Sequence, residues 1–125
     1  MVRLLLLDIE ALDLRHAVRE VQIEMFDDYY KYLDCDTFDI ANRQVGNTRY
    51  DLFVDAEELL KQNPRISAVN KSTQEPMLVG NIIFAKHDMS GETVGLSDAD
   101  IRNIKENIAV AIIQGEIRPL LLCEY

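Results

Sequence analysis

Cysteine, glycine and long apolar runs are scarce in this sequence, and their scarcity excludes several classes of protein. The 125 residues include two cysteines, Cys35 and Cys123, which are too far apart for a Cys-x-x-Cys motif. Neither a zinc knuckle nor a thioredoxin-type redox pair is therefore indicated, and we expect two reduced thiols in a cytosolic protein. The five glycines are scattered, and none belongs to a glycine-rich phosphate-binding loop.

The apolar run near the start of the sequence is too short to enter or cross a membrane. Residues 4–7 are four consecutive leucines, but Asp8 ends the run. A signal-peptide core or a membrane span needs a longer stretch. We therefore expect a cytoplasmic protein without membrane contact.

Basic residues are outnumbered by acidic ones. The chain has 13 Lys and Arg against 22 Asp and Glu, a formal net charge of −9 at pH 7. Residues 1–63 carry fourteen acids and seven bases (−7), and residues 64–125 carry eight acids and six bases (−2). Such a chain repels phosphate backbones, so we expect no direct contact with nucleic acid. The acidity either only solubilises the protein or also attracts a basic protein surface.

Hydrophobic periodicity predicts a single α+β domain over residues 1–125, with a mostly antiparallel sheet and helices packed on one side of it. We expect strands at residues 2–7, 18–24, 37–45, 49–54, 77–85 and 117–122, and helices at residues 26–33, 57–60 and 98–112. A polar loop at residues 8–16 and an apolar segment at residues 66–69 connect them. Ser97 would cap the long helix, Gly115 would end it, and Pro119 would place the final strand at a sheet edge.

An aromatic stripe marks the first predicted helix. Phe26, Tyr29, Tyr30 and Leu33 follow one another at helical spacing. Packing in the core is the plain interpretation of this stripe, and a platform for a ligand is the alternative.

Several segments of the chain together resemble a known family. They are YYKYLDCD (29–36), FDI (38–40), Gly46 with Tyr50-Asp51, DAEELLK (55–61), EPMLVGN (75–81), HD (87–88) and LSDADI (96–101). In this order they resemble an uncharacterised domain family of phages, plasmids and conjugative elements of Gram-positive (Firmicutes) bacteria. The resemblance covers residues 17–108, and residues 109–125 look like an addition to the family pattern. It implies a cytosolic accessory protein of a mobile element, with no catalytic residues to carry over.

His87 and Asp88 are the residues most suggestive of catalysis. A histidine beside a carboxylate can transfer protons or bind a metal. Adjacent residues of a strand point to opposite faces, however, and no serine or cysteine nucleophile motif lies nearby. We expect a role in turn formation, and a small enzyme using His87 is the weakest of three hypotheses.

A carboxylate cluster follows the first predicted helix and consists of Asp34, Asp36 and Asp39. It lacks the glycine and the glutamate of an EF-hand loop, so we predict a solvated acidic rim and no metal site. With Asp27 and Asp28 these residues belong to an acidic region at residues 27–58. This region could imitate a nucleic-acid backbone and occupy a basic groove on a host protein, in binding that weakens with salt.

Two places in the sequence offer backbone amides to an anion. They are the predicted turn at Gly46 and Asn47 and the helix start at Ser97. Tyr50 and Asn81 could add side-chain contacts. A small anionic ligand, such as a nucleotide, is therefore a second hypothesis, in a pocket that a homo-oligomer could complete.

The sequence thus predicts a non-enzymatic accessory protein without cofactor or metal. We expect it to act as a counter-defence inhibitor that binds a host protein through its acidic surface, or to sequester a small anionic signal. The candidate binding residues are Asp27, Asp28, Asp34, Asp36, Asp39, Gly46, Asn47, Tyr50, Asn81, His87 and Ser97.

Overall fold

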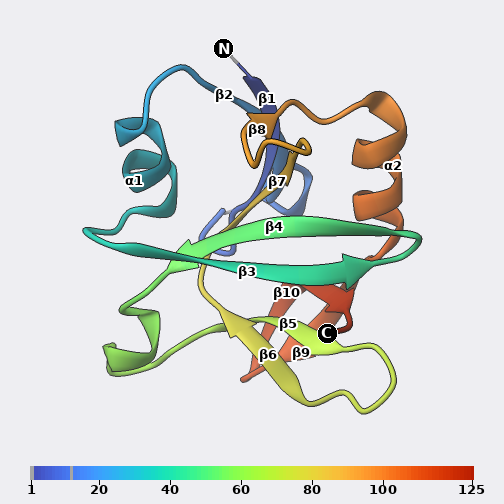
Figure 1. The fold of residues 1–125 in the computed structure, drawn as a ribbon. Helices are drawn as coiled ribbons and strands as arrows, with labels where there is room; N and C mark the ends of the chain where they lie inside the picture. Colours follow the sequence, from blue (N-terminus) through green and yellow to red (C-terminus); the bar gives the residue numbers. More distant parts are fainter. Residues whose placement is uncertain (1, 12) are drawn as a thin grey trace.

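Strands dominate the computed structural model, which describes residues 2–11 and 13–125 (Figure 1). The strands are β1 (Val2–Leu7), β2 (Val18–Ile23), β3 (Phe38–Val45), β4 (Thr48–Asp55), β5 (Ile66–Asn70), β6 (Pro76–Val79), β7 (Ile82–His87), β8 (Thr93–Val94), β9 (Ile108–Ile113) and β10 (Glu116–Cys123). The α-helices are α1 (Asp27–Leu33) and α2 (Asp98–Glu106), and the 3-10 helices are η1 (Leu14–His16) and η2 (Glu58–Leu60).

The strands form two sheets that share one short junction. The first sheet has the order β2-β1-β7-β4-β3, with β8 beside β7, and the second has the order β6-β5-β10-β9. Every pairing is antiparallel except that between β5 and β10. Gln44 at the end of β3 and Glu124 after β10 exchange two backbone hydrogen bonds of 2.9 Å, which join the sheets.

The first sheet is covered on both faces. Side chains alternate between the faces along a strand, and on β4 the phenol of Tyr50 donates to Asp100 of α2. Phe53, on the other face, stacks on Tyr29 of α1 with 4.4 Å between ring centroids. The prediction of helices on one side of the sheet is therefore wrong: α1 and α2 flank the central strands from opposite sides (Figure 1).

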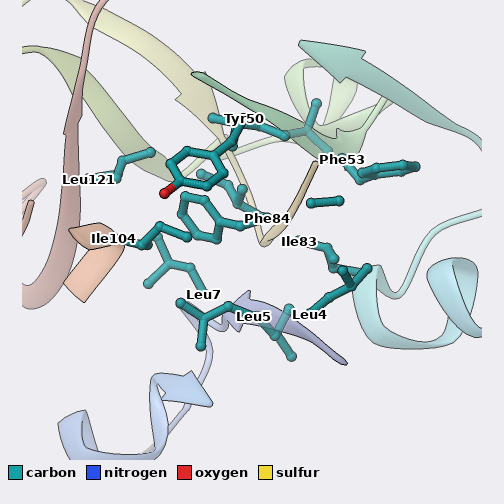
Figure 2. Packing of buried hydrophobic residues seen from close by; sticks show 14 of the residues in the cluster. Leu4, Leu5, Leu7, Tyr50, Phe53, Ile83, Phe84, Ile104 and Leu121 are labelled. Atoms are coloured by element: carbon teal, nitrogen blue, oxygen red, sulfur yellow. The ribbon is translucent and has the colours of Figure 1, made fainter. Parts of the chain in front are cut away.

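The core lies along β1, β4 and β7. All four leucines of residues 4–7 are fully buried, so the predicted strand at residues 2–7 is buried on both faces over this stretch. Ile104 of α2 and Leu121 of β10 meet Tyr50 and Phe84 on one face (Figure 2). The second sheet thus shares with α2 the task of covering that face.

The predicted α+β class with one sheet is also wrong, because strands hold 49% of the chain and helices 17%. Two segments account for the difference. Residues 77–85, predicted as one strand, are two strands in different sheets. Gly80 separates them with a φ of +79° and donates its N–H to Arg65 over 2.8 Å, so the chain leaves the second sheet and enters the first.

The long C-terminal helix is shorter than predicted. Its start is confirmed: Ser97 and Asp100 form a capping box. The helix ends at Glu106, and residues 108–113 are strand β9, because this run rich in β-branched residues pairs with β10. Gln114 and Gly115 both have positive φ, so Gly115 belongs to a hairpin turn and ends no helix.

Pro119 does not place β10 at the sheet edge. β10 lies between β5 and β9, and β5 pairs with it at residues 121–123. In the pairings described, Pro119 lies opposite Val110 of β9 and opposite no residue of β5, so one proline is accommodated in a strand that has neighbours on both sides.

The remaining predictions hold with small shifts of boundary. The hairpin of β3 and β4 turns at Gly46 and Asn47. The short helix is η2, and Asp55 accepts the Glu57 N–H at 2.8 Å ahead of it. The apolar segment at residues 66–69 lies in β5. The predicted loop at residues 8–16 contains η1, and residue 12 of that loop lies outside the described residues.

Gly46 is expected to tolerate alanine less well than Gly91. Both have positive φ, which costs an L-residue about 1–2 kcal/mol. A Cβ at Gly91 would meet open space, whereas at Gly46 it would collide with Asn103 and lie 2.7 Å from Nδ2 of Asn107. Chemical denaturation should therefore show Gly46→Ala to be less stable than Gly91→Ala by about 1 kcal/mol or more. Equal losses of stability in the two variants would mean that Asn103 and Asn107 move aside at no energetic cost.

Candidate functional site

The loop before α1 holds two apolar side chains out of the core. Oδ2 of Asp28 accepts the N–H of Glu24 at 2.8 Å and of Met25 at 3.1 Å. These backbone hydrogen bonds lower the pKa of Asp28. Met25 and Phe26 are each 63% exposed. Asp28, a predicted binding residue, therefore acts on the loop rather than on a ligand.

An apolar groove lies between this loop, α1 and the β3–β4 hairpin. Its volume is about 420 Å³, and its lining includes Ile23, Met25, Phe26, Tyr29, Phe38, Ile40 and Phe53, with Glu24 at the rim. Tyr29 and Leu33 are buried, so half of the aromatic stripe packs in the core. Phe26 stays at the surface, 5.3 Å from the ring of Phe38 and 5.9 Å from that of Tyr30. The stripe is thus divided between the core, as its plain interpretation expected, and the surface, and the ligand platform stays a prediction.

An acidic cavity of about 640 Å³ lies at the C-terminal end of α1. Its carboxylates are Asp34, Asp36, Asp55 and Glu57, and its other lining residues are Tyr30, Lys31, Cys35, Leu60 and Lys61. Asp34 ends α1 in the left-handed conformation, with a φ of 53°, which turns the chain back toward β3. This turn brings Asp34 and Asp36 into one cavity.

Negative charge exceeds positive charge in the acidic cavity. Lys61 Nζ lies 2.7 Å from Oε2 of the buried Glu58 and 3.4 Å from Oδ2 of Asp55, so its charge is already compensated. Within residues 2–11 and 13–125, no ion pair involves Asp34, Asp36 or Glu57. The acidic cavity therefore carries a net negative charge, which favours a positively charged group inside it.

The thiol in the acidic cavity is not activated. Burial, followed by the charges of Asp55 and Asp36, raises the pKa of Cys35 to about 11. At neutral pH the sulfur is a protonated thiol, whereas nucleophilic attack and metal binding need the thiolate. In the part of the chain that the structure describes, no group of three or more His, Cys, Asp or Glu side chains is placed to hold a metal ion.

The other predicted acids take different positions. Asp27 is exposed in the first turn of α1, beside Phe26 at the apolar groove. Asp39 pairs with Val54, and since neighbours alternate along β3 it points away from the face of Phe38 and Ile40. The predicted cluster is thus divided, with Asp39 outside the acidic cavity.

The residues predicted to hold an anion are engaged inside the fold. The phenol of Tyr50 and the hydroxyl of Ser97 both donate to Asp100, at 3.0 and 2.9 Å. Burial alone would raise the pKa of Asp100, but the hydrogen bonds from Ser97 and Tyr50 and the charge of Lys86 outweigh it and lower the pKa. Asn81 accepts the N–H of Ile9 at 3.0 Å.

The predicted turn residues are engaged as well. Gly46 packs against Asn103, and Asn47 accepts the hydroxyl of Thr48 at 2.8 Å. These side chains and turns therefore do not converge on a shared ligand position.

His87 has a carboxylate partner, but it is not Asp88. Nδ1 of His87 lies 2.6 Å from Oδ2 of Asp51, across the pairing of β4 with β7. Asp88 instead accepts the N–H groups of Ser90 and Glu92 and so forms the following turn. Asn42, Arg49 and Lys86 complete a cleft of about 260 Å³ around the His87–Asp51 pair.

Sequence reasoning missed Asp51, because the pairing of β4 with β7 joins residues far apart in the chain. It also missed Met25 and Ile40 of the groove. Each is an apolar residue beside an acidic one in the sequence, and sequence alone does not say whether such a residue lies in the core or at the surface.

A family model for a domain of unknown function, DUF3846, matches residues 8–109. The chain belongs to this family. The match contains both the apolar groove and the acidic cavity apart from Val2 of the groove, and it leaves β10 outside. No curated protein and no solved structure shows significant similarity to the chain. Of the helices in the described ranges, none has the length and apolar character that a membrane crossing needs.

Asp51 is expected to raise the pKa of His87. The hydrogen bond and then the charge of Asp51 favour the imidazolium, so the pKa lies above its ordinary value of 6.5. Because folding raises this pKa, the pair stabilises the fold fully below about pH 6.5, and the contribution disappears as pH rises through the folded-state value.

A titration of the His87 ring by NMR checks this expectation. Asp51→Asn should lower the pKa of His87, and Asp88→Asn should lower it less. An unchanged pKa in Asp51→Asn would show that the 2.6 Å contact is not kept in solution.

Proposed function

We propose that this protein is a non-catalytic accessory protein of a mobile genetic element that binds a basic, partly apolar segment of a host protein in the cytoplasm. The binding region is the α1 surface, defined here as the apolar groove together with the acidic cavity. The observation that carries the proposal is that two hollows, one apolar and one acidic, are both lined by residues of α1.

The apolar half of the α1 surface supplies anchoring contacts. Met25 and Phe26 are each 63% exposed and Ile40 is 56% exposed. Burying such a side chain against a partner contributes about 1.5–3 kcal/mol. Leu60, which lines the acidic cavity, and its chain neighbour Leu59 are also largely exposed, at 83% and 72%. Exposed apolar side chains grouped in this way are typical of a protein-binding surface.

The acidic half of the α1 surface favours a basic partner. Its exposed carboxylates Asp34, Asp36 and Glu57 outnumber its two lysines, and the exposed Glu24 lines the apolar groove. Tyr30 lines the same cavity and offers a ring face to a lysine or arginine side chain. A net charge of −9 adds long-range attraction for the same partner. Such binding is steered by charge and anchored by apolar contacts.

The setting of the proposal comes from the resemblance to a family of phages, plasmids and conjugative elements of Gram-positive bacteria. Accessory proteins of such elements often block a host enzyme. A counter-defence inhibitor of this kind needs a recognition surface and no reactive group, which agrees with the protonated thiol of Cys35.

The His87 cleft supports a second candidate function, a small enzyme with acid–base chemistry. The 2.6 Å contact between His87 and Asp51 is of the kind that orients a catalytic histidine. The cations beside it are engaged, since Arg49 donates to Asn42 at 2.7 Å and Lys86 lies 3.4 Å from Asp100. The cleft lining contains no serine, threonine or cysteine. We therefore place this candidate second. Loss of an activity in His87→Ala, with the fold intact, would move it to first place.

Affinity capture from a Gram-positive host lysate tests the proposal. Wild type should retain a specific protein at low salt and lose it at high salt, because the binding is partly ionic. The double variant Asp34→Asn, Asp36→Asn and the variant Phe26→Ala should each weaken binding of that protein about tenfold or more, which corresponds to about 1.4 kcal/mol.

A matched variant separates the α1 surface from general acidity. Glu75→Gln, Glu92→Gln removes the same two charges from exposed positions elsewhere and should bind like wild type. If both double variants lost the same affinity, the carboxylates of the α1 surface would act only through the net charge of the protein. Retention by Phe26→Ala at full strength would exclude the groove.

A further inference from the structure

Arg118 is a buried cation that lacks a hydrogen-bonded carboxylate. It lies in β10, outside the family match, and only 4% of its surface is exposed. Its Nη2 donates to the side-chain oxygen of Gln114 and, at 3.3 Å, to the carbonyl of Ile113. Among the residues that the structure describes, its Nε and Nη1 have no hydrogen-bond acceptor.

One carboxylate stands near this guanidinium without forming a close pair. Oε2 of Glu116 is 3.8 Å from Nε of Arg118, beyond hydrogen-bond distance, and the Glu116 side chain is 70% exposed. An exposed partner at this distance compensates a buried charge weakly. Burying a guanidinium with two of its three nitrogens lacking an acceptor is unfavourable, so the site is energetically incomplete.

A cavity of about 280 Å³ adjoins the incomplete charge. It is lined by Asn63, Arg65, Gln114, Glu116 and Arg118, which means two guanidinium groups, two amides and one carboxylate. Arg65 is held from outside the cavity by Glu10 and lies 3.6 Å from Glu58. Two guanidinium groups thus line one cavity of a chain whose net charge is −9.

Gln114 holds the cavity in shape. It has a φ of +52°, a conformation that residues other than glycine and asparagine rarely adopt. Its amide donates to the carbonyl of Pro64 at 3.0 Å, and its oxygen accepts the N–H of Ile66 at 3.2 Å as well as Nη2 of Arg118. One strained residue thus ties the hairpin turn to the segment before β5 and fixes the guanidinium.

We propose that this cavity binds a small oxyanion, a phosphate or a carboxylate group, with Arg118 as its charge partner. Guanidinium groups pair with both kinds of oxyanion through charge-assisted hydrogen bonds. The asparagine and glutamine amides at the cavity are further donors. The site is separate from the α1 surface, and it stands or fails independently of the function proposed there.

Thermal unfolding of the full chain in sodium phosphate, sodium acetate and sodium chloride of equal ionic strength tests the site. Wild-type Tm should rise with phosphate or acetate beyond its change in chloride, because a ligand of the folded state stabilises it. A rise in phosphate alone assigns a phosphate ligand, and a rise in acetate alone assigns a carboxylate.

Three variants make the test specific. Arg118→Gln should have a higher Tm than wild type without the anion, because a buried charge that Glu116 compensates only weakly is removed, and should lose the anion-dependent rise. Arg102→Gln makes the same change of net charge at an exposed position of α2 and should keep the rise. Glu116→Gln removes the competing carboxylate and should enlarge it. The proposal is overturned if the anion raises the Tm of wild type and of Arg118→Gln equally. It is also overturned if the anion does not raise the Tm of wild type, or if the rise in Glu116→Gln equals that of wild type.

Discussion

The paired strands β1 and β7 are apolar on both faces, and the need to cover both faces determines the rest of the structure. Leu4 to Leu7 leave no polar side on β1, and Ile82, Ile83, Phe84 and Ala85 leave none on most of β7. A sheet with such a centre cannot expose a face to water. Helix α1 covers one face, and α2 together with the second sheet covers the other. The α1 surface exists because a helix of seven residues covers its face incompletely and leaves a hollow near each of its ends.

Several short carboxylates of this chain serve the backbone. Asp28, Asp55, Asp88 and Asp100 each accept N–H groups at a turn or a helix start. Short carboxylates are common at such positions because they satisfy amides that the helix or turn leaves open. The carboxylates that accept no backbone N–H remain available for recognition, and Asp34 and Asp36 are among them. They meet in the acidic cavity because α1 ends there in a left-handed residue.

The hairpin of β9 and β10 has a structural and a chemical role. Leu121 and Cys123 of β10 are buried in the core, and β10 links the second sheet to the first through Glu124 and Gln44. The same strand carries Arg118, whose burial is not explained by core packing. A charge kept in the fold against its own energetic cost points to a ligand that compensates it.

Local signals were enough for the sequence to determine several of the single elements. The four leucines of β1, the turn at Gly46 and Asn47 and the cap at Ser97 depend on nearest neighbours, and each was predicted correctly. The acidic cluster was recognised in part, as Asp34 and Asp36, since residues so close in the chain share a neighbourhood in almost any fold. Tertiary structure alone decided the division into two sheets, the opposite placement of the helices and the pairing of His87 with Asp51. Residues 108–113 became a strand because β10 was there to pair with them, and no periodicity within the segment contains that information.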